Sequence, residues 1–148
     1  MESSPPARVL VVASRTAATP ALISAVAQRA ARGPCTFTLL VPSPAHGLHR
    51  VVDPEDQDED NSEAAAVLAL ALPLLEQAAG AQVEGIVGDS EPMAAIHDAV
   101  NLRGFDEIIL STLPARVSRW LKLDLPSKVG GLGLPVTHVS ASTDEPTA

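Results

Sequence analysis

The side chains best suited to binding chemistry are gathered in one short segment, residues 111–129, which reads "STLPARVSRWLKLDLPSKV". The segment carries four cations against a single acid and holds the only Trp, although the formal net charge of the chain is −8. Its charged residues are Arg116, Arg119, Lys122, Lys128 and Asp124. Guanidinium and ammonium groups hold phosphates and carboxylates through charge-assisted hydrogen bonds. The segment is therefore a candidate for binding an anion.

The sequence around this segment predicts strands and helices in alternation. Apolar, β-branched runs predict five strands, at Arg8–Ser14, Cys35–Val41, Gln82–Gly88, Asp106–Thr112 and Leu134–Ser140. Helical spacing of apolar residues follows the first four strands, with helices expected to begin at Pro20, after Ser62, at Pro92 and at Pro126. Alternation of this kind predicts an α/β fold, a Rossmann-like three-layer sandwich in which helices cover both faces of a five-stranded parallel sheet.

Several details of the helices are also predicted. Thr19 is the expected N-cap of the first helix and Gly33 its stop. Ser62 is expected to cap the second helix, which Pro73 should kink or shorten. For the third helix, Asp89 or Ser90 is the expected cap. Its inward stripe is expected at Met93, Ile96, Val100 and Ala99.

Length and composition predict a single soluble domain. A chain of 148 residues is expected to form one α/β domain over residues 8–140, with disordered tails at 1–7 and 141–148. The acidic balance argues against a nucleic-acid partner. The longest apolar run, Ala64–Leu75, is too short for a membrane span, and no signal peptide is evident, so we expect a cytoplasmic protein. The acidic run Asp53–Asp60 is interpreted as a solvated loop or the approach to a helix.

Sheets of this type bind ligands outside the carboxyl ends of their strands, near the point where strand order reverses. Residues that follow the predicted strands, together with polar residues of the basic segment, therefore form a candidate crevice for an anion or a nucleotide. These residues are Ser14, Arg15, Thr16, Gly88, Ser111, Thr112, Arg116, Ser118, Arg119 and Ser127.

The basic segment also has two other interpretations. Val117, Trp120, Leu121 and Leu123 could anchor it on the sheet while the cations face water, since the two sets fall on different sides of a helical turn. Alternatively, the segment around Trp120 could dock a protein partner, because a Trp beside cations is typical of such surfaces.

No catalytic machinery can be nominated from spacing. No Ser lies in a Gly-x-Ser-x-Gly turn, and "GGLG" precedes no Lys-Ser/Thr pair. His46 and His49 with Asp53 and Glu55 could suit a metal ion, but they are interpreted as surface residues of a loop. The lone Cys35 is interpreted as a packing residue. We therefore expect neither an enzyme nor a metal protein.

The layout resembles the universal stress protein family, small five-stranded α/β proteins, over about residues 8–140. "GDSEPMAAIHDAVNLRGFDEIILST" is similar to the family stretch Gly-x-Pro…Ile…Asp-x-Ile-Val-x-Gly-Ser, and "LPVTHVS" to its final Pro-Val strand. "VLVVAS" lies where the family has a first strand that ends in Asp. The resemblance implies the same fold.

In ATP-binding members of that family, a Gly-x2-Gly-x9-Gly-Ser/Thr loop cradles the phosphates after the fourth strand. With the spacing kept, these positions fall on Ser111, Pro114, Asp124 and Leu125, and the first-strand Asp falls on Ser14. Glycine lets backbone N–H groups approach a phosphate, whereas proline removes an N–H and a carboxylate repels the anion. The resemblance therefore implies a member that does not bind ATP in the usual way.

Two functions remain open from the sequence. The first is a non-catalytic regulatory or stress-response module, without a cofactor, that forms a homodimer through its exposed last strand, Leu134–Ser140. The second is a binder of a nucleotide or another anionic small molecule through Arg15, Arg116 and Arg119.

Overall fold

A computed structural model describes most of the chain, with the side chains of α2 described from Ala64 onward. The described ranges are 6–13, 17–42, 54–88, 91–112 and 124–140. Predictions for Ser14–Thr16, for the histidines at 46 and 49, and for the segment around Trp120 lie outside these ranges.

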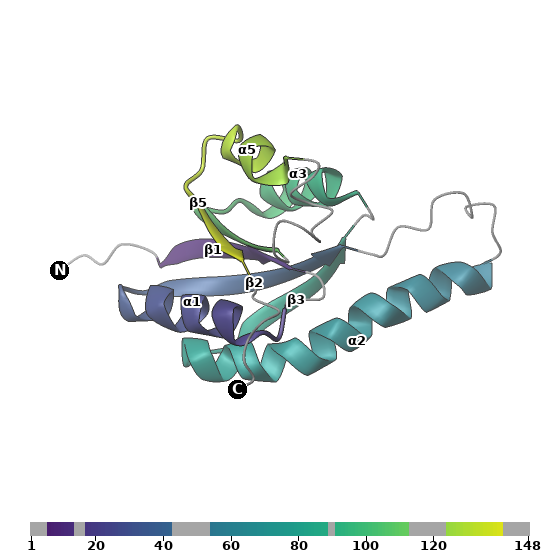
Figure 1. The fold of residues 1–148 in the computed structure, drawn as a ribbon, viewed down its shortest axis with the longest axis horizontal. Helices are drawn as coiled ribbons and strands as arrows, with labels where there is room; N and C mark the ends of the chain where they lie inside the picture. The colour runs from purple at the N-terminus through teal and green to yellow at the C-terminus, as the bar shows by residue number, and fades with distance from the viewer. Residues whose placement is uncertain (1–5, 14–16, 43–53, 89–90, 113–123, 141–148) are drawn as a thin grey trace.

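The core of the fold is a five-stranded sheet in which every neighbouring pair is parallel. The strand order is β3-β2-β1-β4-β5 (Figure 1). The strands are β1 Ala7–Val12, β2 Cys35–Pro42, β3 Val83–Gly88, β4 Glu107–Thr112 and β5 Val136–Ser140. The predicted fold class is confirmed, and each strand begins and ends within two residues of its expected boundaries.

Helices cover both faces of this sheet and create two apolar clusters. α1 (Pro20–Ala31) and α2 (Pro54–Ala79) lie on one face, and α3 (Pro92–Arg103) and α5 (Leu125–Gly130) on the other (Figure 1). Alternate residues of β1 serve the two clusters, with Val9 and Val11 on the α1–α2 side and Leu10 and Val12 on the other. Since side chains alternate along a strand, a continuous apolar run is what a strand covered on both faces requires.

The boundaries of α2 differ from the prediction. The helix begins at Pro54, so most of the acidic run is helical backbone rather than a loop, and Ser62 lies inside the helix instead of capping it. Proline is preorganised for the first helical position. Acidic residues in the first turn stabilise the start of the helix, because they interact favourably with the positive end of the helix dipole. Pro73 lies within the helix and does not shorten it, because burial of Ala71 and Leu75 on either side holds the helix on the sheet and offsets the cost of the proline.

The N-terminal part of α2 reaches beyond the sheet (Figure 1). With 26 residues the helix is about 39 Å long, whereas β3 beneath it, with six, spans about 20 Å. None of the described helices is long and apolar enough to cross a membrane.

The cap of α3 also differs from the prediction, while its buried face was largely anticipated. Glu91 is the N-cap residue, and its Oε1 accepts a hydrogen bond from the Ala94 N–H at 3.3 Å. The expected caps at 89 and 90 lie outside the described residues. Ile96 and Ala99 are buried, as expected, and Met93 and Val100 are partly buried. The buried Ala95 was missed because a small residue contributes little to a periodicity pattern.

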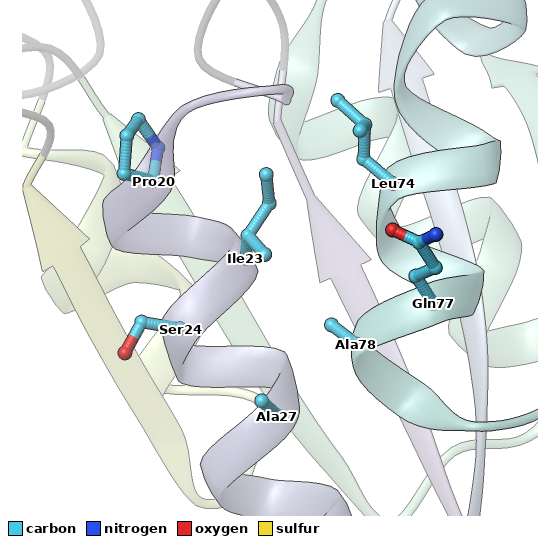
Figure 2. Close-up of a pocket in the computed structure, with 7 residues that line it drawn as sticks. All are labelled: Pro20, Ile23, Ser24, Ala27, Leu74, Gln77 and Ala78. Atoms are coloured by element: carbon cyan, nitrogen blue, oxygen red, sulfur yellow. The ribbon is translucent and has the colours of Figure 1, made fainter.

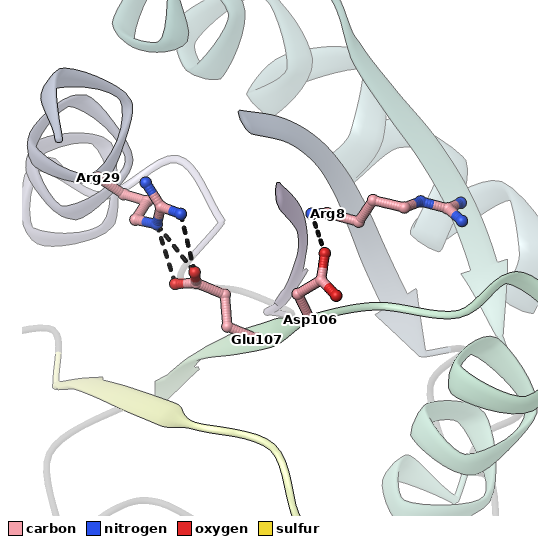
Figure 3. Close-up of polar contacts among 4 residues, drawn as sticks. All are labelled: Arg8, Arg29, Asp106 and Glu107. Carbon is pink, nitrogen blue, oxygen red and sulfur yellow. Dashed lines mark hydrogen bonds and ion pairs between the residues drawn. The ribbon is translucent and has the colours of Figure 1, made fainter. Parts of the chain in front are cut away.

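Charged side chains connect neighbouring elements at the end of the sheet where the strands begin (Figure 3). Arg29 of α1 donates from Nε and Nη2 to both carboxylate oxygens of Glu107 at 2.9–3.0 Å. This hydrogen bonding raises the pKa of the Arg29 guanidinium. Asp106 Oδ2 accepts a hydrogen bond from the Arg8 N–H at 2.8 Å, and the Arg8 guanidinium lies 5.4 Å from the centre of the Phe105 ring. These contacts tie α1, β1 and β4 together.

The part-buried Arg29–Glu107 pair should contribute much more stability than the exposed Arg103–Glu84 pair, whose Nη1 and Oε2 atoms are 2.7 Å apart. Glu107→Gln leaves a shielded guanidinium without its charged partner, so we expect it to lower the free energy of unfolding by about 2 kcal/mol. The matched change Glu84→Gln should lower it by less than about 0.5 kcal/mol. Urea unfolding of both variants measures the difference, and equal losses would contradict this assignment.

Candidate functional site

The order of the strands defines one switch point, between β1 and β4. The chain runs from β1 outward through β2 to β3, and then returns to place β4 on the other side of β1. Val12, at the end of β1, pairs with Leu110 of β4, so the carboxyl ends of these two strands lie side by side. This is where parallel α/β sheets form ligand crevices. The sequence predicted a candidate crevice at the carboxyl ends of the strands, and the topology places the switch point there.

Ser111 and Thr112 of β4 lie at this edge, but their side chains are buried. Thr112, only 2% exposed, has its Oγ1 2.9 Å from Nε2 of His138 on β5. Nothing in the sequence indicates this contact. The pair forms because β4 and β5 are parallel, with Leu110 opposite His138 and Thr112 opposite Ser140. No sequence signal links positions that are 26 residues apart in this way.

Gly88 has a packing role in the structure. It ends β3, which is separated from β4 by two other strands. A Cβ atom at this position would lie 2.8 Å from the Cβ of Ala95 and 2.8 Å from Cδ1 of Leu40. Both distances are too short for real contacts, so the absence of a side chain is what lets α3 approach the sheet.

The remaining predicted site residues are not brought together by the described structure. Ser127 is exposed on α5. The other predicted members of the crevice lie outside the described residues, and they are Ser14, Arg15, Thr16, Arg116, Ser118 and Arg119. A group of three or more His, Cys, Asp or Glu side chains placed to hold a metal ion does not occur among the residues that the structure describes.

Asp124 and Leu125 occupy the positions where the resemblance places the last glycine and the hydroxyl of a phosphate loop. Asp124 has φ 59° and ψ 37°, the left-handed conformation that glycine adopts most easily. Its side chain makes no capping hydrogen bond to α5, which begins at the next residue. Leu125 is 2% exposed and belongs to the apolar cluster beneath α3 and α5. The glycine-like backbone is thus present, but it carries a carboxylate and is followed by a core residue.

Cys35 is placed as a packing residue, as the sequence indicated. It begins β2 beside Arg29 and packs against the α1–α2 cluster. Burial raises the pKa of its thiol, and although Arg29 opposes this effect, the net shift is upward. A raised pKa disfavours the thiolate, which is the form that acts as a nucleophile.

A groove of about 520 Å³ lies between α1 and α2 (Figure 2). Its walls are mostly apolar and include no charged side chain. They consist of Pro20, Ile23, Ser24, Ala27, Leu74, Gln77 and Ala78. The groove can therefore accept apolar atoms, but it lacks the charged side chains that bind a phosphate most strongly.

Comparison with known proteins identifies the fold. No protein-family model and no curated sequence matches the chain. Among solved structures, a universal stress protein from Archaeoglobus fulgidus is 18% identical, with a TM-score of 0.63 over 90% of this chain and 93% of its own. A universal stress protein in complex with cAMP is 17% identical, with a TM-score of 0.61 over 92% and 98% of the two chains. An AMP-bound family protein from Arabidopsis thaliana is 14% identical, with a TM-score of 0.58 over 95% of both chains. The chain therefore has the universal stress protein fold.

The left-handed backbone at Asp124 predicts an unusual order of stability among substitutions. Alanine is strained at positive φ and has no polar side chain that could hydrogen-bond locally, as Asp can. Asp124→Ala should therefore lower the free energy of unfolding by about 1 kcal/mol. Asp124→Gly should cost at most a few tenths, because relief of strain offsets the greater freedom of glycine in the unfolded chain. Chemical denaturation of the two variants tests the prediction, and an Ala variant as stable as the Gly variant would refute it.

Proposed function

We propose that this protein is a non-catalytic, cytoplasmic regulatory module that acts as a homodimer and does not hold ATP through a backbone cradle. The observation that carries the proposal is the pair Asp124–Leu125. A phosphate loop needs main-chain N–H groups that face the anion and a hydroxyl that reaches it. A carboxylate at 124 opposes the first need, and a leucine turned into the core removes the second.

The Thr112–His138 pair supports a non-catalytic module as well. A hydroxyl 2.9 Å from an imidazole nitrogen has the spacing of a nucleophile and its base. The hydroxyl of Thr112, however, is buried, so a substrate carbonyl has no approach to it. In the described part of the chain, moreover, no carboxylate is bonded to the ring of His138 to orient it. The pair instead links β5 to β4.

A second candidate function is binding of an adenosine monophosphate or a similar small anion. It is favoured by the three neighbours that were solved with cAMP, dAMP and AMP. A single phosphate needs fewer N–H donors than a triphosphate, and side chains can supply them. Arg15, Arg116 and Arg119 follow β1 and β4 in the sequence and have the required charge.

A ligand screen separates the two candidates. We expect MgATP at about 1 mM to leave the midpoint of thermal unfolding unchanged, because a site without a cradle binds it too weakly to stabilise the fold. AMP, dAMP and cAMP are tested at the same concentration. Stabilisation by a monophosphate that disappears in Arg116→Ala/Arg119→Ala, but persists in the control Lys128→Ala, would establish the second function. Stabilisation by MgATP that survives the double substitution would refute the proposal.

The homodimer is proposed to form through β5, which is the less protected of the two sheet edges. β3 at the other edge carries Glu84, which is paired with Arg103 of α3, and such charges discourage strand addition. β5 reads "VTHVS" and contains neither a Lys, Arg, Asp or Glu nor a proline. It therefore offers a row of backbone groups without the usual protection.

The hydrogen bonds of β5 also suggest a register for the dimer. The carbonyl of Pro135 accepts from the Ile108 N–H at 2.9 Å, so the carbonyl of residue 135 faces β4. Because backbone groups alternate along a strand, those of Val136, His138 and Ser140 face the open edge. An antiparallel pair centred on His138 uses all three from each copy. It also places the two His138 side chains directly opposite each other.

This register predicts that like charges at position 138 weaken the dimer. His138→Lys sets two ammonium groups opposite each other, at a cost of roughly 1 kcal/mol or about fivefold in Kd. Sedimentation should show this loss in His138→Lys but not in the neutral variant His138→Gln. His97, exposed on α3, provides the control, and His97→Lys should behave as the wild type. A wild-type monomer at every concentration would refute the pairing.

A further inference from the structure

The outward face of α2 lacks the charges that normally cover an exposed helix. The run Ala64–Leu75, "AAAVLALALPLL", contains no polar side chain at all. Its inward residues are buried against the sheet, but Leu70 is 65% exposed and Leu74 is 37% exposed. Ala65, Ala66, Ala69 and Pro73 are exposed between them. A helix that is apolar on every side is ordinarily covered on every side.

This face continues into the groove between α1 and α2. Leu74 forms part of both, because it is exposed on the outer face of α2 and also lines the groove opposite Pro20 and Ile23 of α1 (Figure 2). The exposed apolar residues of α2 and the groove therefore make one surface, which we call the α2 face. On α2 it consists of Ala65, Ala66, Ala69, Leu70, Pro73 and Leu74, and it continues to Pro20 and Ile23 of α1. Contiguous apolar surfaces of this kind mark sites of protein association.

We propose that the α2 face is an interface between two copies of this chain, which pack with their α2 helices antiparallel. The face is self-complementary, since it sets the large Leu70 beside the small Ala66 and Ala69. A two-fold axis near Leu70 lets the leucine of each copy fill the space above the alanines of the other. Small residues also let two helices approach closely, at the short end of the usual range of about 8–10 Å between axes.

The charge of α2 selects the antiparallel orientation. The helix begins with acid-rich turns, from Glu55 to Asp60, that reach beyond the sheet (Figure 1). Parallel packing would set these turns side by side and repel the two copies. Antiparallel packing about Leu70 separates them by about 36 Å, which is several Debye lengths at physiological salt. It also directs each acidic end toward the C-terminal end of α1 of the other copy, where Arg32 is exposed.

The proposed two-fold contact at Leu70 lies away from the edge proposed for pairing through β5. α2 packs against β3 and β2, whereas β5, at the far edge of the sheet, contacts α1. Substitution of Leu70 therefore leaves β5 unchanged, and the two interfaces can be lost separately. Used together, two different two-fold contacts produce a tetramer or an extended assembly rather than a single dimer.

Substitution of Leu70 tests the interface, with Leu102 as a matched control. Leu102 of α3 is 83% exposed and lies on the other face of the sheet. We expect Leu70→Glu to halve the mass of the full-length protein in sedimentation equilibrium. Leu102→Glu should keep the wild-type mass. A wild-type mass in Leu70→Glu, or a wild-type monomer, would overturn the proposal.

A cross-linking experiment gives a readout that does not depend on disrupting the surface. Leu70→Cys and Leu102→Cys are each combined with Cys35→Ser, so that each variant has one thiol. Near a two-fold axis the two thiols introduced at position 70 lie close together, so oxidised glutathione should convert most of the Leu70→Cys variant to a covalent dimer. The Leu102→Cys variant should remain uncrosslinked under the same conditions. Equal cross-linking of both variants, or none in Leu70→Cys, would overturn the proposal whatever the fate of the β5 pair.

Discussion

The parallel pairing of β1 with both β2 and β4 is the constraint on which the rest of the structure depends. Parallel strands cannot be joined by tight turns, so each connection must cross over a face of the sheet, and helices provide the crossovers. Both faces are then covered, and Val9, Leu10, Val11 and Val12 are fully buried. The same pairing creates the switch point, because the chain leaves β1 in one direction and returns beside it as β4. The core and the candidate crevice therefore have a common origin.

The segment at Asp124 and Leu125 joins an exposed acidic residue to a residue of the core. The backbone at 124 keeps a conformation that glycine would favour, so the turn into α5 does not require a change of path. What differs is the side chains, since Asp124 adds a negative charge and Leu125 contributes to the core. Leu125 is buried among the apolar side chains beneath α3 and α5, whereas Asp124 is exposed.

The contacts at the beginning of the strands differ in kind from those at their carboxyl ends. At the beginning of the strands, Arg29–Glu107 and Arg8–Asp106 join elements that are distant in the sequence. At the end of the strands, the Oγ1 of Thr112 and the Nε2 of His138 lie 2.9 Å apart and join β4 to β5. Charged contacts therefore join α1, β1 and β4 at one end of the strands, and a hydroxyl–imidazole contact joins β4 to β5 at the other.

Local sequence alone determined the alternation of strands and helices, and hence the fold class, because apolar periodicity and prolines at helix starts act within a few residues. It also predicted a candidate crevice at the carboxyl ends of the strands, because parallel topology places a switch point there. The tertiary structure decided what depends on partners far along the chain. The contact between Thr112 and His138 depends on the register between β4 and β5. The requirement for glycine at position 88 depends on how closely Ala95 of α3 approaches the sheet. The start of α2 at Pro54 was missed because a run of acids resembles a solvated loop until the helix that contains it is seen.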